Sequence, residues 1–313
     1  MANGEWRMGR GRCARMLPVD GVLVLDKPVG PSSHDMVALA RRLLHQRQVG
    51  HAGTLDPLAS GVLVLCLGKA TRLSEYLLGE DKAYEAVLRL GQRTTTDDAE
   101  GEVVVERPVP AITAADLRAL EARFSGTIEQ VPPAFSAVKR AGQRAYALAR
   151  QGQPVALSPR QVTIRELHLA HGDAPDQLRL WMRCSAGTYV RALARDLGEV
   201  LGCGAHLVAL RRTQSGAFTL ADAVTPTQLE AVARAGNAAA LVLPPERALE
   251  GWQAVHLDAE RSRRLCQGQR LRLALALAPG ALVRVHSASG ALIAVAEWDG
   301  EGLRPLKVLE THP

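Results

Sequence analysis

Apolar side chains along the chain form two patterns that are typical of β-strands. Nearly continuous apolar runs at residues 21–26 and 61–67 indicate strands that are buried on both faces. At residues 82–90 and 178–184, apolar and polar positions alternate, which indicates strands with one buried face. The first of these alternating strands carries Tyr84 among its apolar positions.

Start signals predict helices between and after these strands. Ser32 and Asp35 have the spacing of a capping box, and apolar residues follow at helical intervals. Thr113 and Asp116 repeat this signal before a second amphipathic segment that stops at Gly126. Two more helices are expected, one after the Gly187-Thr188 turn and one with Thr225 as N-cap and Pro226 in its first position.

Strands that follow one another directly, with helices scattered among them, favour an α+β fold over a doubly wound parallel sheet. The pattern changes near Pro244. Beyond Trp252, short strands at 271–276, 281–286 and 291–298 are separated by turns, and they predict a small β-barrel. We expect three parts: a basic, flexible arm at 1–20, a larger domain at 21–245 and a C-terminal domain at 252–313.

Composition limits the class of protein. A chain of 313 residues suffices for about two domains. Its 47% hydrophobic and 22% charged residues exclude a wholly disordered chain, and its apolar runs are far shorter than the ~20 residues of a membrane span. Lys and Arg exceed Asp and Glu by 38 to 32, so a polyanionic partner is favoured.

Cysteine usage and the N-terminus indicate the compartment. The five cysteines are scattered and form no C-x-x-C pair, which argues against a disulfide framework. Cys203 and His206 have ligand-like spacing but no second ligand pair follows, so no metal is expected. The arginine-rich first residues lead into no apolar run of a secretory signal. A cytoplasmic protein is therefore expected.

The densest cluster of unusual residues is the loop at 50–61, Gly-His-Ala-Gly-Thr-Leu-Asp-Pro-Leu-Ala-Ser-Gly. Its glycines permit backbone conformations that other residues avoid, and Pro57 holds Asp56 out of the helical region. The Asp56 carboxylate would thus be presented from a stiff support. Alone, an Asp-Pro pair is more often an Asx-turn whose carboxylate bonds its own backbone.

This loop resembles, almost letter for letter, the catalytic signature of the bacterial TruB-type tRNA pseudouridine-55 synthases. Further motifs of that family follow in its order, so the resemblance covers residues 21–218. They are found at 21–33 (GVLVLDKPVGPSS), 68–71 (GKAT), 81–84 (DKAY), 132–139 (PPAFSAVK), 185–198 (SAGTYVRALARDLG) and 210–213 (LRRT).

The resemblance implies a pseudouridine synthase fold, with a mixed, largely antiparallel sheet, followed by a PUA-like β-barrel that binds RNA. It also implies the isomerisation of uridine to pseudouridine at T-loop position 55 of tRNA. The N1–C1′ bond breaks, the uracil turns and C5 bonds C1′, so no cofactor is required. Asp56 is the implied catalytic carboxylate; it acts either as a nucleophile or by stabilising an electron-poor sugar carbon.

Three further residues are implied around this carboxylate. Arg191 is its partner, whose planar fork could grip Asp56 with two hydrogen bonds. Tyr84 stacks on the target base, and proton transfer is its second possible role. Tyr189 forms another wall of the uracil pocket, although a core tyrosine remains an equal alternative. Arg191 would otherwise be an ordinary exposed helix arginine.

RNA binding is assigned to separate residues. The uridine must leave its stack, and His51 would lie near the flipped-out nucleotide unless it only anchors the loop. Leu210 is a further substrate-binding residue by resemblance. Residues 132–153 are interpreted as a mobile flap on the T-arm, with Lys139 and Tyr146 on the RNA, although a solvated basic face is the simpler interpretation.

Two other functions compete with this hypothesis. A non-catalytic RNA-binding or tRNA-folding protein would use the same basic surfaces but would not need Asp56, Tyr84 and Arg191 together. A glycosidase-like hydrolase would need a second acid opposite Asp56, and neither Asp97 nor Asp98 is visibly committed to that role. We expect a monomeric enzyme that acts on tRNA without a cofactor and without a membrane.

Overall fold

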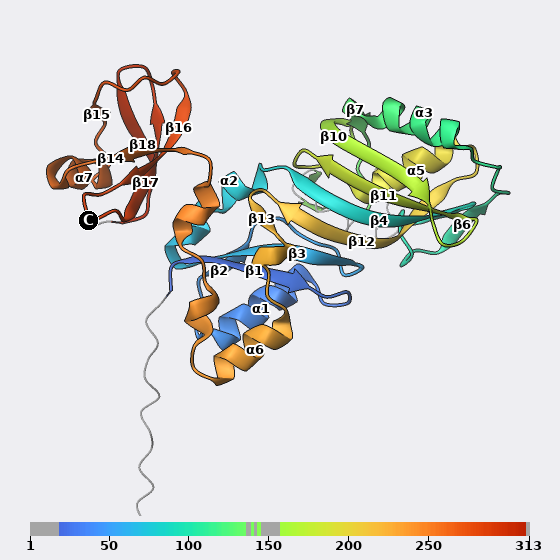
Figure 1. Cartoon of the computed structure of the whole chain (residues 1–313), viewed down its shortest axis with the longest axis horizontal. Coiled ribbons are helices and arrows are strands. Elements are labelled where there is room, and N and C mark those ends of the chain that lie inside the picture. Colours follow the sequence, from blue (N-terminus) through green and yellow to red (C-terminus); the bar gives the residue numbers. More distant parts are fainter. Residues whose placement is uncertain (1–18, 136–138, 141–142, 145–156, 311–313) are drawn as a thin grey trace, which may run out of the picture.

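The computed structural model describes residues 19–135, 139–140, 143–144 and 157–310. Its main feature is a nine-stranded sheet (Figure 1). Neighbouring strands are antiparallel except β3 and β12, which are parallel, so the expected mixed, largely antiparallel sheet is confirmed. The order is β1 (Gly21–Lys27), β3 (Ala59–Leu67), β12 (Ala205–Ser215), β4 (Lys82–Leu90), β11 (Gln177–Cys184), β10 (Arg160–His171) and β7 (Gly126–Gln130), with β2 (Val49–His51) on β3 and β13 (Phe218–Thr219) on β12.

The helices begin at the residues that the sequence signals predict. Ser32 and Asp35 form a capping box, as do Thr113 and Asp116, and Thr225 caps a helix with Pro226 in its first turn. Each cap satisfies backbone N–H groups that the first turn leaves without partners. The helices are α1 (Ser33–Leu43), α2 (Ser74–Leu78), α3 (Ala114–Phe124), α5 (Val190–Val200), α6 (Pro226–Arg234) and α7 (Ala259–Cys266), with short 3-10 turns at Gly68–Leu73, Leu220–Asp222, Ala238–Leu241 and Pro245–Leu249.

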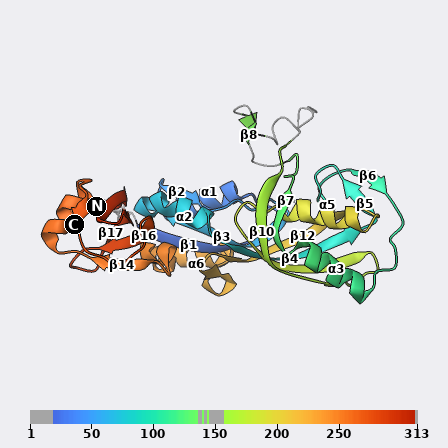
Figure 2. The same ribbon diagram turned by 90° about the horizontal axis from the view of Figure 1, so that it is seen from above.

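One face of the sheet carries the larger core. Tyr84, Ala86 and Leu88 alternate along β4 and point to the face on which Leu193 of α5 and Leu120 of α3 are buried in the same cluster. Figure 2 shows α3 and α5 beside the strands β4, β10 and β12. Helix α5 therefore lies where it can place its first residues beside the end of β4.

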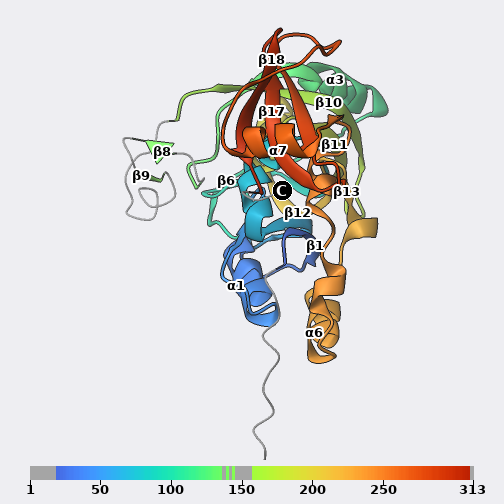
Figure 3. The same cartoon turned by 90° about the vertical axis from the view of Figure 1, so that its left-hand side faces the viewer.

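A second, five-stranded sheet follows near the C-terminus and curls into a half-barrel (Figure 3). The predicted strand at 271–276 is wrong in length, because only Leu271 and Arg272 pair with a neighbour, whereas Leu273 and Leu275 pack against the core without strand pairing. The order is β14 (Gln253–His256), β16 (Ala281–His286), β17 (Leu292–Trp298), β18 (Gly302–Val308) and β15 (Leu271–Arg272).

The half-barrel packs against the end of the main sheet. Leu292 and Val295 of β17 share an apolar cluster with Phe218 and Leu249. Lys307 lies 2.7 Å from Glu75 at the edge of this contact. The two sheets are thus joined by a common apolar interface.

Several expectations concern residues outside the described ranges. The arm at 1–20 and the flap at 132–153 lie largely outside them. Within the flap, two short strands are described, β8 (Lys139–Arg140) and β9 (Gln143–Arg144), which pair with each other. The remaining strands, β5 (Gln92–Thr94) and β6 (Val103–Glu106), form a hairpin. In the described part of the chain, no helix is both long and apolar enough to cross a membrane.

Candidate active site

The loop between β2 and β3 holds Asp56 through backbone contacts to its neighbours. Ser33, at the start of α1, donates from Oγ to the Leu55 carbonyl at 2.9 Å and accepts from the Leu55 N–H at 2.8 Å. The Gly30 N–H donates to the Pro57 carbonyl at 2.9 Å. Gly53 has a φ of +110°, a conformation that favours glycine. The main chain on both sides of Asp56 is therefore held by hydrogen bonds, one set from the Ser33 side chain and one from the Gly30 N–H.

The Asp56 carboxylate contacts a guanidinium from another part of the chain. Its Oδ2 atom lies 2.9 Å from Nη2 of Arg191, the second residue of α5. The Asp56 side chain is 42% exposed, whereas that of Arg191 is 8% exposed. The arginine therefore lies beneath the carboxylate, whose other side is open to a ligand. The simple Asx-turn does not describe this loop, since the carboxylate reaches a distant partner.

Arg191 divides its donors between two carboxylates. Nη1 lies 3.2 Å from Oδ2 of Asp98 and donates to the Thr96 carbonyl at 3.1 Å, while Nη2 also donates to the Phe135 carbonyl at 2.9 Å. Asp98 is only 3% exposed at its side chain. This differs from the expected grip in which both donors bind Asp56. The buried carboxylate instead orients the guanidinium toward the exposed one.

The role of Asp98 as a partner of Arg191 was not predicted from the sequence. Asp98 was weighed only as a second catalytic acid, as was Asp97, and the structure places both against α5. Asp97 contacts Arg195, one helical turn after Arg191, at 3.1 Å. The sequence does contain two adjacent acids, Asp97 and Asp98, and two arginines four residues apart on one helix face. Only the fold shows that the acids contact the arginines.

The start of α5 is anchored from β7. The side chain of Gln130 accepts from the Tyr189 N–H at 2.8 Å and donates to the Tyr189 carbonyl at 3.1 Å. Gln130 is buried. Because Arg191 follows Tyr189 by two residues, these bonds fix the position of the first turn of α5 and therefore that of the Arg191 guanidinium.

A buried lysine, Lys27, lies near enough to Asp56 for the two charges to interact. Lys27 donates from Nζ to the carbonyls of Pro28 and Pro31, each at 2.8 Å. Burial lowers the pKa of the Lys27 ammonium, and the negative charge of Asp56 nearby opposes that shift. Lys27 therefore folds the segment that contacts the loop and adds a second positive charge near the carboxylate.

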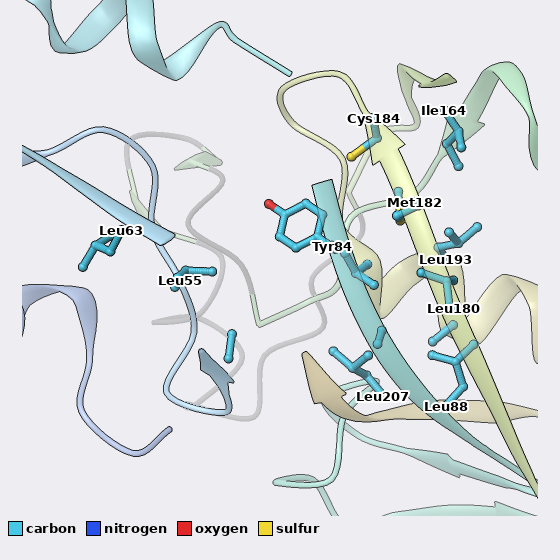
Figure 4. Packing of buried hydrophobic residues seen from close by; sticks show 14 of the residues in the cluster. Leu55, Leu63, Tyr84, Leu88, Ile164, Leu180, Met182, Cys184, Leu193 and Leu207 are labelled. Carbon is cyan, nitrogen blue, oxygen red and sulfur yellow. The ribbon is translucent and has the colours of Figure 1, made fainter. Parts of the chain in front are cut away.

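Tyr84 lies at the edge of the core, next to the loop. Figure 4 shows its ring among Met182 and Cys184 and its hydroxyl pointing toward the side on which Leu55 and Leu63 lie. Burial raises the pKa of the Tyr84 phenol, while the positive charge of Arg212 lowers it. Tyr84 is thus both a core residue and a neighbour of Asp56, which also acts on its pKa.

Comparison with known proteins agrees with this arrangement. The model of the TruB family pseudouridylate synthase N-terminal domain matches residues 41–190. Models of the tRNA pseudouridylate synthase B C-terminal domain and of the pseudouridine synthase II TruB C-terminal region match 191–250 and 254–309. The chain belongs to the TruB family.

Relatives of this chain from Ralstonia and Burkholderia share the name tRNA pseudouridine synthase B. The chain is 52% identical to tRNA pseudouridine synthase B of Ralstonia nicotianae over 298 residues, which cover 93% of this chain and 94% of the relative. It is 49% identical to the protein of that name from Burkholderia mallei, with 96% and 97% covered. The resemblance drawn from the motifs is confirmed, and with it the enzyme class, an isomerase of the pseudouridine synthases.

Solved structures extend the similarity to the fold. A chain in the crystal structure of a Cbf5-Nop10-Gar1 complex matches with a TM-score of 0.73 and 27% identity, covering 93% of this chain and 85% of that one. A chain in the structure of an H/ACA RNP bound to a substrate RNA containing 2′-deoxyuridine matches with a TM-score of 0.72 and 25% identity, covering 94% and 87%. The α+β fold with a PUA-like C-terminal part is thereby confirmed.

The other predicted TruB residues lie at different distances from this centre. Tyr189 is half-buried at the N-cap of α5. Leu210 pairs with Ala86 across β12 and β4, so it shares the sheet face of Tyr84. Lys139 lies in β8, but its side chain is outside the described set, and Tyr146 falls outside the described residues altogether.

His51 ends β2 at the head of the loop that carries Asp56. Its ring packs edge-to-face against His34, with ring centres 5.4 Å apart. Among the described residues its Nδ1 atom has no hydrogen-bond partner, although it is buried. Burial lowers the pKa of the His51 imidazole, with the neighbouring His34 and Arg212 acting in the same direction. A neutral, half-buried ring is suited to stacking, and its Nδ1 atom does not anchor the loop.

Metal ligands are not gathered at this centre. In the residues that the structure covers, no group of three or more His, Cys, Asp or Glu side chains is arranged to hold a metal ion.

Proposed function

We propose that this TruB-family chain converts uridine to pseudouridine at T-loop position 55 of tRNA, with Asp56 as the catalytic carboxylate. The observation that carries the proposal is the partly exposed Asp56 carboxylate held 2.9 Å from the buried Arg191 guanidinium. An ionised carboxylate in a partly desolvated site needs an opposite charge close by, and Arg191 supplies it. The exposed side of Asp56 is left for the substrate.

The chemistry that this carboxylate would serve is an internal exchange of bonds. The N1–C1′ bond of uridine breaks, C5 bonds C1′, the C5 proton is lost and N1 gains a proton, so all atoms balance. Asp56 acts either by attack on the substrate or by stabilising positive charge at the sugar carbon. Arg191 orients its carboxylate and places positive charge beside it in both cases. Tyr84, beside it, offers a flat ring to the uracil.

The uridine must leave its stack before it can reach Asp56, which costs a few kcal/mol. The neutral, half-buried ring of His51 at the loop head provides a surface for the vacated space or the displaced base. We assign the C-terminal half-barrel to binding of the tRNA outside the T-loop, and we expect the enzyme to act as a monomer on the T-arm.

The proposal is tested with an unmodified tRNA transcript and mapping of pseudouridine. The parent chain is expected to modify the T-loop uridine at position 55 alone. Asp56→Asn, which keeps the size of the side chain, should bind the transcript within about twofold of the parent and form no pseudouridine, a loss of at least ~10⁴-fold. Asp173→Asn is the matched control, because the Asp173 side chain is 83% exposed.

Three outcomes contradict the proposal in whole or in part. Full activity of Asp56→Asn would remove the catalytic role of this carboxylate. Tight tRNA binding by the parent without any pseudouridine would instead favour the non-catalytic RNA-binding protein that the sequence left open. Pseudouridine at a different position would retain the reaction but overturn the T-loop assignment.

A further inference from the structure

Arg212 is a buried arginine that the reaction scheme above does not use. It is only 1% exposed, yet its guanidinium donates to backbone carbonyls of the catalytic loop and of β3. Nε donates to Val62 at 2.7 Å, Nη2 to Gly53 at 3.2 Å and Nη1 to Thr54 at 3.4 Å. Two of these carbonyls belong to the loop that carries Asp56. One side chain thus spans the loop and the strand that follows it.

The backbone of Arg212 joins the two strands that frame the site. In β12 it pairs with Gly61 of β3 on one side and with Tyr84 of β4 on the other. A register shift follows between Arg212 and Gln214, and such bulges redirect side chains next to active sites. Gly61 has a φ of +101°, and a Cβ added there would lie 2.2 Å from the Arg212 carbonyl. The contact between these strands therefore depends on glycine at position 61.

The positive charge of the Arg212 guanidinium faces backbone carbonyl groups. No carboxylate of the described residues lies within ion-pair distance of its guanidinium. A buried cation without a counter-ion is costly, and its carbonyl contacts offset only part of that cost. Its charge reaches the Tyr84 phenol on the facing strand, whose pKa it lowers against the effect of burial.

We propose that Arg212 is a positioning residue that holds the Asp56 loop in register with the strand of Tyr84 and places positive charge next to that tyrosine, its partner across β12 and β4. The inference rests on the proposed function of the same site. Arg191 sets the direction of the Asp56 carboxylate, whereas Arg212 sets where the loop lies relative to the tyrosine strand. A displacement of about 1 Å between two reacting groups is enough to slow a reaction by ~10²-fold.

The kinetic test uses Arg212→Lys and, as a matched control, Arg211→Lys. Arg211 directly precedes Arg212 in the chain. Its side chain is 38% exposed and pairs with Asp26 at 2.8 Å. Lysine keeps the charge at position 212 but cannot reach three carbonyls at once. The single-turnover rate of Arg212→Lys on saturating tRNA should fall by ~10²-fold while its Kd for tRNA stays within about twofold. Arg211→Lys should change neither quantity beyond about twofold.

A purely structural role predicts a different result. Arg212→Lys would then lower Tm and the active fraction, but each folded molecule would react at the parent rate. Active-site titration with an RNA inhibitor separates these cases, since it counts folded, binding-competent molecules. An unchanged rate per binding-competent molecule overturns the inference.

A spectroscopic readout does not depend on activity. The chain has four tyrosines, so 3-fluorotyrosine gives four fluorine resonances, and Tyr84→Phe identifies that of Tyr84. In Arg212→Gln the Tyr84 phenol should titrate at higher pH than in the parent, because the neighbouring positive charge is gone. Equal titration midpoints in the two proteins overturn the inference. If the parent itself makes no pseudouridine, the proposed function fails, and this measurement still tests whether the charge of Arg212 acts on the Tyr84 phenol.

Discussion

Arg191 and Arg270 each contact two acids, and their surroundings differ. Arg191 contacts Asp56 and Asp98 in the main sheet domain, with 8% of its side chain exposed. Arg270 contacts Asp299 and Glu301 in the C-terminal half-barrel, with 38% of its side chain exposed. The shortest of these four contacts belongs to Arg270, at 2.6 Å to Asp299, whereas its contact to Glu301 is 3.3 Å. Contact distance alone therefore does not show which triad matters to function.

Burial decides what each triad contributes. Around Arg270, water competes for every charge, so the ion pairs add little to stability. Around Arg191, the guanidinium and Asp98 have lost their water, so each depends on the other. Only Asp56 keeps an exposed edge. In the buried triad, Asp98 holds the Arg191 guanidinium in place, and the guanidinium in turn orients the Asp56 carboxylate. The exposed triad around Arg270 has no buried acid that could orient a carboxylate in this way.

Between the two triads, the largest effect on stability is expected from Asp98→Ala. Removing a buried partner leaves one arm of Arg191 without its carboxylate, which should lower the free energy of unfolding by about 3 kcal/mol. The single-turnover rate should fall by ~10²-fold, because the guanidinium can turn away from Asp56. Urea unfolding and single-turnover assays measure the two losses. Parent-like values of both would show that the buried triad is no different from the exposed one.

Removing both buried partners separates stability from catalysis. In the double variant Asp98→Leu with Arg191→Met, no buried charge is left unpaired, so at least half of the stability lost in Asp98→Ala should return. Activity should not return, because Asp56 has lost its cation. Urea unfolding and the pseudouridine assay on the same preparation test this. A double variant less stable than Asp98→Ala would mean that the carbonyl contacts of Arg191 outweigh its ion pair.

The smallest effect is expected from Arg270→Gln. Tm should fall by at most about 2–3 °C at pH 7, and less in high salt. Hydrogen bonds from Arg270 lower the pKa of the Asp299 carboxyl, so the contribution of this pair is complete above the unfolded carboxyl pKa of ~3.9. It is lost as the pH falls through the lowered folded value. Thermal scans of both proteins should therefore differ at pH 7 and converge in strong acid; a difference that persists there contradicts this assignment.

Local signals predicted much of the fold, because they act within a few residues. The capping box of Ser32 and the alternation along β4 depend on neighbours in the chain, and both are observed. The strand expected at 271–276 failed because alternation shows which face a strand would bury but not whether another strand is present to pair with it.

The site was predictable as far as motifs name residues. Asp56 and Arg191 were expected to meet, and they do. The sequence could not show that Asp98 is buried or that Arg212 crosses from one strand to the loop of another, because both facts arise from pairing between distant segments. Lys27 is similar, since a lysine in a motif does not by itself indicate a fully buried ammonium.

The apolar interface between the half-barrel and the main sheet has a geometric consequence. Leu292 and Val295 are buried against residues of the catalytic part, so the half-barrel cannot swing freely. The distance between the surface of the half-barrel and Asp56 is thereby fixed. Under the proposed function, an RNA that contacts both the half-barrel and Asp56 would need a matching length, so its shape would be selected before any base is recognised.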